Sequence, residues 1–145
     1  MKSLSVKTKF GWITALEDKG IIVRVKFGKG KRNFSSKNLN KFRNNLNNFF
    51  NNKAKSLNFN YNQAGNITQK KIWRELTKIK YGKTKSYGEI ARKFKISPRH
   101  VGKICAQNKI PLAIPCHRVI RSDGSLGGFS APGGIKLKKK LLNFE

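Results

Sequence analysis

The stretch "AIPCHRVI", residues 113–120, places a cysteine directly before a histidine. Both residue types are scarce, since the chain of 145 residues holds two cysteines and two histidines. The thiolate is the nucleophilic form of cysteine, and an ordinary thiol with a pKa of about 8.5 is mostly protonated at neutral pH. A nearby imidazole can accept that proton, directly or through a water molecule. The pair Cys116–His117 therefore indicates nucleophilic chemistry, with an ordinary buried cysteine as the alternative.

The backbone around this pair has to bend if the two side chains are to cooperate. Pro111 and Pro115 keep the segment from being a plain helix or a central strand. The residues from Cys116 onward are typical of a strand, in which neighbouring side chains point to opposite faces. Contact between the thiol and the imidazole therefore requires a bend at Pro115 or a bridging water.

Metal and cofactor chemistry find little support in the residue pattern. A zinc site would have to be built from Cys105, Cys116, His100 and His117. These residues lack close paired spacings such as Cys-x-x-Cys, and the glycine-rich loop at 122–134 has neither the Walker nor the Rossmann spacing. We expect no metal and no cofactor. Two cysteines also make no disulfide framework, which favours a reducing compartment, the cytoplasm.

The charge of the chain indicates a polyanionic partner. There are 33 Lys and Arg against 6 Asp and Glu, a formal net charge of +27. Each phosphate that a basic residue neutralises releases counterions and strengthens binding, so nucleic acid is the expected partner. A Lys- and Asn-rich composition without function is the alternative. We expect no membrane partner, because no basic amphipathic helix, signal peptide or membrane span stands out.

Residues 1–66 are expected to form a small α/β domain. Residues 10–28 alternate apolar and basic side chains around the turn "EDKG", which predicts a β-hairpin. A helix is predicted within 33–66, because apolar residues recur there at helical spacing: Leu39, Phe42, Leu46, Phe49 and Phe50. The alternation in "SLNFNYN", residues 56–62, predicts a further strand.

Residues 67–145 are expected to form a mostly α-helical domain with a helix-turn-helix. A helix is predicted over 68–79, and a capping box from Ser86 to Glu89 opens a second helix. Ser97 is predicted to be the N-cap of a third helix, with Pro98 at its first position. In that helix Val101, Ile104 and Cys105 form an inward stripe. The outward stripe consists of Arg99, Gly102, Lys103 and Ala106.

That outward stripe has two interpretations. Basic residues with small ones between them would let the helix lie close against a nucleic-acid groove, whereas the alternative is a solvated charged face. The last predicted helix, 135–145, has Leu137, Leu141 and Phe144 on its inward side. The run Lys138–Lys140 within it is interpreted as a solvated face.

The order of several motifs resembles the O6-alkylguanine-DNA alkyltransferase family. "IPCHRVI" followed by "SDGSLGGFS" is similar to the family's active-site segment. The similarity extends through "YGKTKSYGEIA", "RHVGKI", "NKIP" and "KLLNFE", and so covers roughly Thr68 to Glu145. It implies an RNase H-like N-terminal domain and a winged-helix-like C-terminal domain that docks in the DNA minor groove. It also implies that the damaged guanine is flipped into a pocket.

The resemblance implies a role for each of several residues. Cys116 would accept the alkyl group permanently, His117 would act as its base through a water, and Glu145 would orient the imidazole. Tyr87 would donate a proton to the departing purine. Arg99 would fill the stack that the base vacates, beside further DNA contacts at Ser97, Gly102, Lys103 and Ala106. The pocket and its support would comprise Asn108, Arg118, Val119, Ile120, Phe129, Ser130 and Lys138.

The expected function is therefore single-turnover DNA repair by a monomer. Its partner would be double-stranded DNA containing O6-alkylguanine, with O4-alkylthymine as a second lesion. One alternative is a lesion-sensing module that binds alkylguanine without transfer, although those relatives replace the cysteine. Another is a cysteine hydrolase that uses Cys116 and His117. For Glu145 the alternative to a catalytic role is a solvated helix end.

Overall fold

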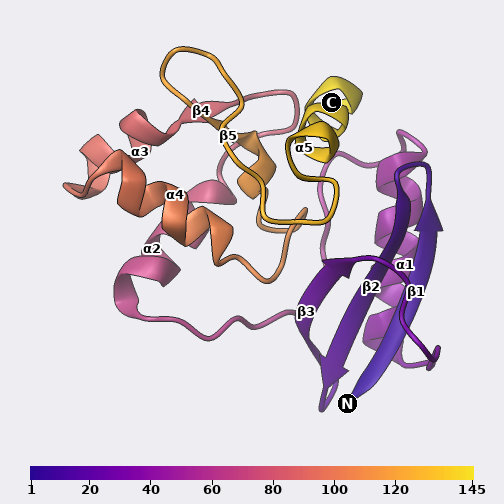
Figure 1. Ribbon diagram of the computed structural model, residues 1–145. Helices are drawn as coiled ribbons and strands as arrows, with labels where there is room; N and C mark the ends of the chain where they lie inside the picture. Colours follow the sequence, from indigo (N-terminus) through magenta and orange to yellow (C-terminus); the bar gives the residue numbers. More distant parts are fainter. The chain divides into compact units, whose positions relative to one another are not determined.

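The computed structural model describes residues 1–145 and divides them into two compact units, 1–64 and 65–145 (Figure 1). No helix in either unit has the length and apolar character needed to cross a membrane.

The first unit is built on a three-stranded antiparallel sheet in the order β1-β2-β3. Its strands are β1 (Lys2–Thr8), β2 (Gly11–Asp18) and β3 (Ile21–Phe27). The predicted hairpin of β2 and β3 is confirmed. Its two turn residues, Lys19 and Gly20, both have positive φ, as the tight turns that match strand twist require. Strand β1 was not predicted, although Leu4 and Val6 alternate with polar residues and are buried.

One helix, α1 (Lys37–Phe50), covers a face of this sheet. Ser36 caps it by accepting a hydrogen bond from the Leu39 amide, and the five apolar residues predicted for its inward side are all buried. The predicted strand at 56–62 is wrong, since only an isolated bridge joins Tyr61 to Ile22. Asparagine side chains of α1 bind the backbone of this segment instead of a neighbouring strand. Asn45 accepts from the Asn58 amide, and Asn38 accepts from the Asn60 amide.

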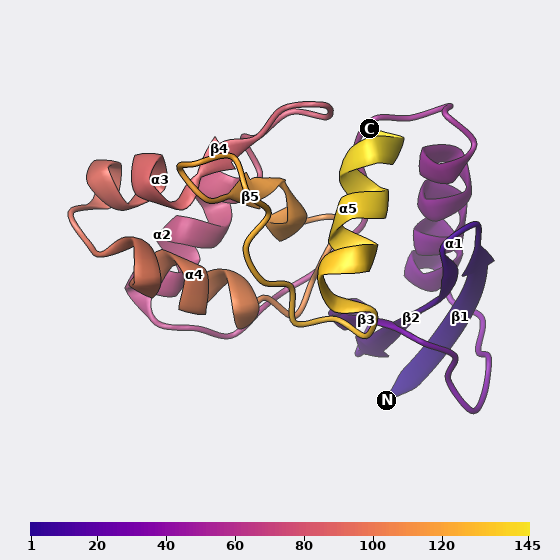
Figure 2. The ribbon, with the colours of Figure 1, turned by 45° about the horizontal axis from the view of Figure 1, so that its top comes forward.

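The second unit is mostly helical (Figure 2). Its helices are α2 (Ile67–Leu76), α3 (Tyr87–Phe94), α4 (Pro98–Ala106) and α5 (Gly134–Phe144). Two short parallel strands, β4 (Lys85–Ser86) and β5 (Val119–Ile120), join the start of α3 to the segment after the cysteine. Together the two units give the chain mixed α/β content with a small antiparallel sheet.

The predicted helix-turn-helix geometry is present in α3 and α4. Ser86 and Glu89 form the predicted capping box, and Ser97 caps α4 by accepting from the His100 amide. Lys95 ends α3 in the left-handed conformation, with φ of 56°, which turns the chain sharply into α4. The Trp73 indole of α2 donates to the Ile104 carbonyl at 3.1 Å, which holds the inward side of α4 against α2.

The strand predicted from Cys116 onward is shorter than expected. Cys116–Arg118 form a single 3₁₀ turn, and the strand consists of Val119 and Ile120 alone. The cause lies in the preceding turn, where the Asn108 side chain donates to the Ile114 carbonyl at 2.9 Å and accepts from the Ile110 amide at 3.0 Å. A bend near Pro115, one of the two alternatives for cooperation between the thiol and the imidazole, is thus present, and an asparagine braces the turn that builds it.

Candidate active site

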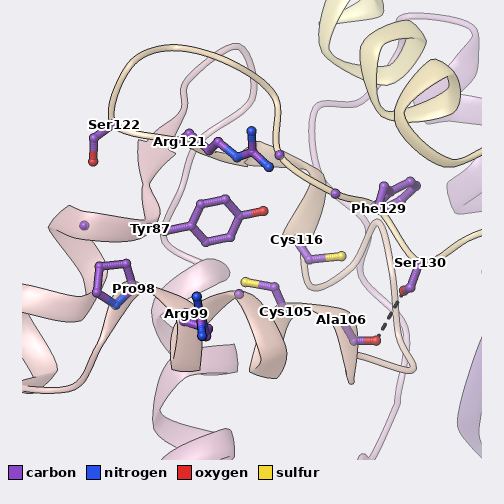
Figure 3. A pocket seen from close by; sticks show the side chains of 14 residues that line it. Tyr87, Pro98, Arg99, Cys105, Ala106, Cys116, Arg121, Ser122, Phe129 and Ser130 are labelled. Atoms are coloured by element: carbon purple, nitrogen blue, oxygen red, sulfur yellow. Dashed lines mark hydrogen bonds between the residues drawn. The ribbon is translucent and has the colours of Figure 1, made fainter.

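A pocket of about 670 Å³ opens in the second unit, and Cys116 lies on its wall (Figure 3). Seven of the predicted site residues line it: Tyr87, Arg99, Gly102, Ala106, Cys116, Phe129 and Ser130. Helix α4 supplies one wall, and the loop at 127–130 lies opposite. Ser130 closes that loop against α4 by donating to the Ala106 carbonyl at 3.2 Å.

The loop passes so close to Tyr87 that glycine is needed in it. Gly127 has φ of 73°, and a Cβ there would lie 3.0 Å from the Tyr87 ring. A side chain would therefore strain the backbone and displace the ring. The "LGG" of the sequence thus sets the position of the phenol in the pocket.

The remaining predicted site residues lie outside the pocket wall. Val119 and Ile120 form β5 and are not among the residues that line the pocket. Ser97 caps α4, and Lys103 is exposed on the outward stripe of that helix. Behind the wall lie Asn108, His117, Arg118, Lys138 and Glu145, of which four are ionisable.

Cys116 is a buried thiol that needs help to ionise. Burial raises the pKa of Cys116, while a hydrogen bond from Asn108 and the charge of Lys138 act in the opposite direction. The balance keeps the thiol protonated at neutral pH, because the shift is upward from a value already above 7. A base must therefore take its proton before it can attack a carbon.

His117 and Glu145 supply a base with a defined orientation. The ring of His117 is buried, and its Nε2 lies 2.9 Å from Oε2 of Glu145. Burial lowers the pKa of His117, although the bond to Glu145 opposes this shift. The imidazole is therefore neutral, its Nε2–H donates to the carboxylate, and Nδ1 keeps the lone pair that can accept a proton.

Glu145 is fixed by a second partner. Arg118 donates to both of its oxygens, from Nε at 2.9 Å and from Nη2 at 2.7 Å, and the carboxylate side chain is 1% exposed. Burial alone would raise the pKa of Glu145, but the hydrogen bonds from His117 and Arg118 outweigh it and lower the pKa to about 2. The alternative of a solvated helix end is therefore wrong.

Glu145→Gln is expected to lower the free energy of unfolding at neutral pH by about 3 kcal/mol, because Arg118 would keep a buried charge without its partner. The pKa of Glu145 is about 2 in the folded chain, against an ordinary value of 4.5. The carboxylate therefore stabilises the fold fully above about pH 4.5, and this contribution is lost as the pH falls toward about 2. Urea denaturation at a series of pH values measures the free energy of unfolding. It should show the loss of stability at neutral pH, and in the variant a weaker dependence of stability on pH below about 4.5.

Glu89→Gln is the matched control, because Glu89 is exposed and glutamine also completes a capping box. Equal losses in the two variants at neutral pH would contradict the buried pairing of Glu145.

Lys138 corrects the interpretation of the run Lys138–Lys140. Lys139 and Lys140 are exposed, but Lys138 is fully buried, because it follows Leu137 on the inward side of α5. Its Nζ donates to the carbonyls of Val119 at 2.7 Å and Gly128 at 3.3 Å, and also to the carbonyl of Leu126. One lysine therefore ties α5, the strand after the cysteine and the pocket loop together.

The same lysine orients Tyr87. Nζ of Lys138 lies 3.3 Å from the Tyr87 hydroxyl oxygen and also 3.3 Å from the Gly128 carbonyl, so one of its three N–H groups is shared between these two acceptors. Because the hydroxyl oxygen accepts from Lys138, the phenol proton is free to point elsewhere. Burial raises the pKa of Tyr87 to about 12, which keeps the phenol protonated at neutral pH. Tyr87 is thus a hydrogen-bond donor at the pocket. Cys105, the second thiol at the pocket, has a pKa raised to about 12 by burial and is a poor nucleophile.

Sequence reasoning missed one charged residue at the pocket. Arg121 lines it from the turn after β5, together with Gly88, Pro98 and Ser122. The Asp123–Gly124 pair is a turn signal, but nothing in the spacing indicates that the arginine before this turn faces the pocket.

Comparisons with known proteins identify relatives of this chain. A methylated-DNA–protein-cysteine methyltransferase of Sulfolobus acidocaldarius is 44% identical over 98 residues, which cover 68% of this chain and 61% of the relative. The protein of that name from Methanocaldococcus vulcanius is 51% identical over 76 residues, which cover 52% of this chain and 45% of the relative. The chain thus spans about half the length of the curated relatives it matches.

Solved structures agree over nearly the whole chain. The crystal structure of Mycobacterium tuberculosis OGT in complex with DNA superposes with a TM-score of 0.85 at 26% identity, covering 99% of this chain and 92% of that one. An O6-methylguanine DNA methyltransferase from Methanococcus jannaschii gives 0.71 at 28% identity, covering 97% of this chain and 92% of that one.

The family comparison matches the part of the chain that holds the pocket. Residues 67–145, more than half of the chain, match the family described as "6-O-methylguanine DNA methyltransferase, DNA binding domain". This stretch contains Cys116, the braced turn before it and the buried pair of His117 and Glu145. The chain therefore belongs to the 6-O-methylguanine DNA methyltransferase family.

Proposed function

We propose that this protein repairs O6-alkylguanine in DNA by transferring the alkyl group irreversibly to Cys116. The observation that carries the proposal is the pocket that Cys116 and a protonated Tyr87 both line, together with the buried bond between Glu145 and His117, the residue that follows Cys116. A thiol, a neutral base and a phenol donor are the groups that such a displacement needs. The relatives named methylated-DNA–protein-cysteine methyltransferases support the same reaction.

The residues divide the proton transfers between them. The Cys116 proton passes through a water to Nδ1 of His117, and Glu145 stabilises the imidazolium that forms. The thiolate sulfur then forms a bond to the alkyl carbon while the bond from that carbon to guanine O6 breaks. The electron pair of the broken bond stays with the purine, and Tyr87 donates a proton to it. The thioether is stable, so the protein ends alkylated.

The lesion has to leave the duplex before it can reach Cys116. An alkyl carbon on guanine O6 is inaccessible within stacked DNA, so the nucleotide is flipped into the pocket. Helix α4 presents Arg99, Lys103 and the small residues between them on its exposed side, and this is the side proposed to dock on DNA. The relative from Mycobacterium tuberculosis was crystallised with DNA, which supports this partner.

The proposal includes a fold for each of the two domains. Residues 67–145 would act as a winged-helix-like DNA-binding and transfer domain, and residues 1–66 as an RNase H-like domain. The protein would act as a monomer on O6-alkylguanine, with O4-alkylthymine as a second lesion, on DNA in the cytoplasm. The presence of Cys116 favours transfer over a module that only senses the lesion.

Repair is expected to be stoichiometric. Because no group in the pocket can regenerate a thiol from a thioether, each protein should remove one methyl group. Titration of the protein with a duplex containing O6-methylguanine, followed by nucleoside analysis, measures the equivalents repaired. A plateau well above one equivalent would mean turnover and would contradict irreversible transfer.

Arg99→Ala is expected to slow repair of duplex DNA by about a hundredfold while leaving the reaction with free O6-benzylguanine nearly unchanged. Flipping costs a few kcal/mol in a duplex and nothing for a free base, so a residue that stabilises the vacated stack matters only in the former. Pseudo-first-order rates on the two substrates measure the difference. Equal slowing on both would show instead that Arg99 supports the pocket itself.

A further inference from the structure

Arg121 is a positively charged pocket residue whose side chain has no binding partner within the protein. It follows β5, is exposed and lines the pocket. Its guanidinium makes no hydrogen bond and no ion pair, whereas the two buried cations of this unit, Arg118 and Lys138, are engaged. Arg118 is bound to Glu145, and Lys138 donates to three carbonyls and a phenol. Arg121 is therefore available for a ligand.

The backbone of Arg121 is held in a tight turn. Its amide donates to the Ser125 carbonyl at 2.8 Å, and its carbonyl accepts from the Gly124 amide at 2.9 Å. The turn also packs on the start of α3, since a Cβ at Gly88 would lie 2.8 Å from the Ser122 hydroxyl. The guanidinium thus extends from a fixed point, which reduces the entropy lost when it binds.

The pocket mouth carries positive charge on two sides. None of the 14 lining residues is acidic, and two of them are arginines. In Figure 3 Arg121 lies on one side of the Tyr87 ring and Arg99 of α4 on the other. The nearest acid in the turn is Asp123, and its carboxylate accepts from the Ser125 amide at 2.9 Å and from the Ser125 hydroxyl at 2.7 Å. The ligand that fits this mouth is an anion.

We propose that Arg121 is a positioning residue that binds a DNA phosphate beside the flipped nucleotide. This inference rests on the proposed function and adds the phosphate site to it. A nucleotide that enters the pocket carries its flanking phosphates to the mouth, and a guanidinium can bind a phosphate through two parallel hydrogen bonds. Arg121 therefore acts on any nucleotide with a phosphate, whether or not it has to be flipped, whereas Arg99 acts only where a stack has to be filled.

Three substrates separate these roles: a duplex with O6-methylguanine, a single-stranded oligonucleotide with the same base, and free O6-benzylguanine. Arg121→Ala is expected to slow transfer about tenfold on both DNA substrates and to leave the free base within twofold of wild type. Its duplex affinity should also fall less steeply with salt, by about 0.9 in the slope of log K against log salt concentration. Arg121→Lys should restore the salt slope and only part of the rate, because a lysine lacks the planar fork.

Arg92→Ala is the matched control, because Arg92 is exposed on α3 and does not line the pocket. It should leave all three rates within twofold of wild type.

Neutral methylphosphonates identify the phosphate that is bound. The methylphosphonates are placed one at a time around the lesion. A substitution at one flanking position should weaken DNA binding by wild-type protein, and at that position alone the substitution should not change DNA binding by Arg121→Ala. Equal slowing by Arg121→Ala on all three substrates, or an unchanged salt slope, would overturn the phosphate site. A failure of the proposed function would be distinct, because wild-type protein would then transfer no methyl group from either DNA substrate.

Discussion

Cys116→Ser is expected to abolish alkyl transfer, with a fall of at least about a thousandfold on both duplex and free-base substrates. A serine hydroxyl is far less acidic than a thiol, and a buried neutral imidazole cannot make it an equivalent nucleophile. Affinity for DNA should stay within a few-fold of wild type, because phosphate contacts on the surface carry it rather than the thiol. A gel-shift titration and a single-turnover rate, measured on one preparation, test both halves.

Cys105→Ala is the matched control for this variant. Both thiols line the same pocket, but the pKa of Cys105 is raised to about 12 by burial, and it is Cys116 that is followed in the chain by His117, the partner of Glu145. The control should therefore retain transfer within about tenfold of wild type, since it removes a packed side chain and not the nucleophile. Transfer that survives in Cys116→Ser and disappears in Cys105→Ala would reverse the assignment.

Lys138→Met is expected to cost about 3 kcal/mol of stability and to slow transfer about a hundredfold on every substrate. Methionine fills much of the same volume but donates no hydrogen bond, so three carbonyls of the strand and loop lose a shared donor in a buried site. The loop that confines Tyr87 then loses its tie to α5. Urea denaturation gives the stability, and the rate with free O6-benzylguanine gives the effect on chemistry without DNA binding.

Lys139→Met is the control for Lys138→Met, because the next residue of α5 is exposed. It should change stability by less than about 0.5 kcal/mol and leave the rate unchanged. If Lys138→Met behaved like this control, the loop would be held by other contacts, and the central place given to Lys138 would be wrong.

Local signals in the sequence predicted the helices whose ends and inward sides depend on residues close together in the chain. The capping box of Ser86 and Glu89, the Ser97–Pro98 start of α4 and the apolar spacing of α1 are set by neighbours a few residues apart. Such contacts can be inferred from spacing. The inward position of Cys105 followed from the same periodicity and is confirmed.

The failures share a different cause, which is competition from side chains that lie outside the predicted element. The strand expected at 56–62 is replaced by backbone bonds to asparagines of α1, and Asn108 helps to bend the segment expected to be a strand at Cys116. Lys138 was assigned to solvent because a lysine run is usually solvated. Its burial depends on carbonyls that only the folded loop brings together, so no pattern within α5 could reveal it.

The residue that carries the methyl group after reaction identifies the nucleophile. Wild-type protein is incubated with an excess of duplex DNA containing O6-methylguanine, weighed intact and then digested with trypsin. We expect the protein to gain one methyl group, and this group should be found on the peptide 110–118, which contains Cys116. A methyl group on the peptide 104–109, which contains Cys105, or an unchanged mass after the lesion has disappeared from the DNA, would contradict this expectation.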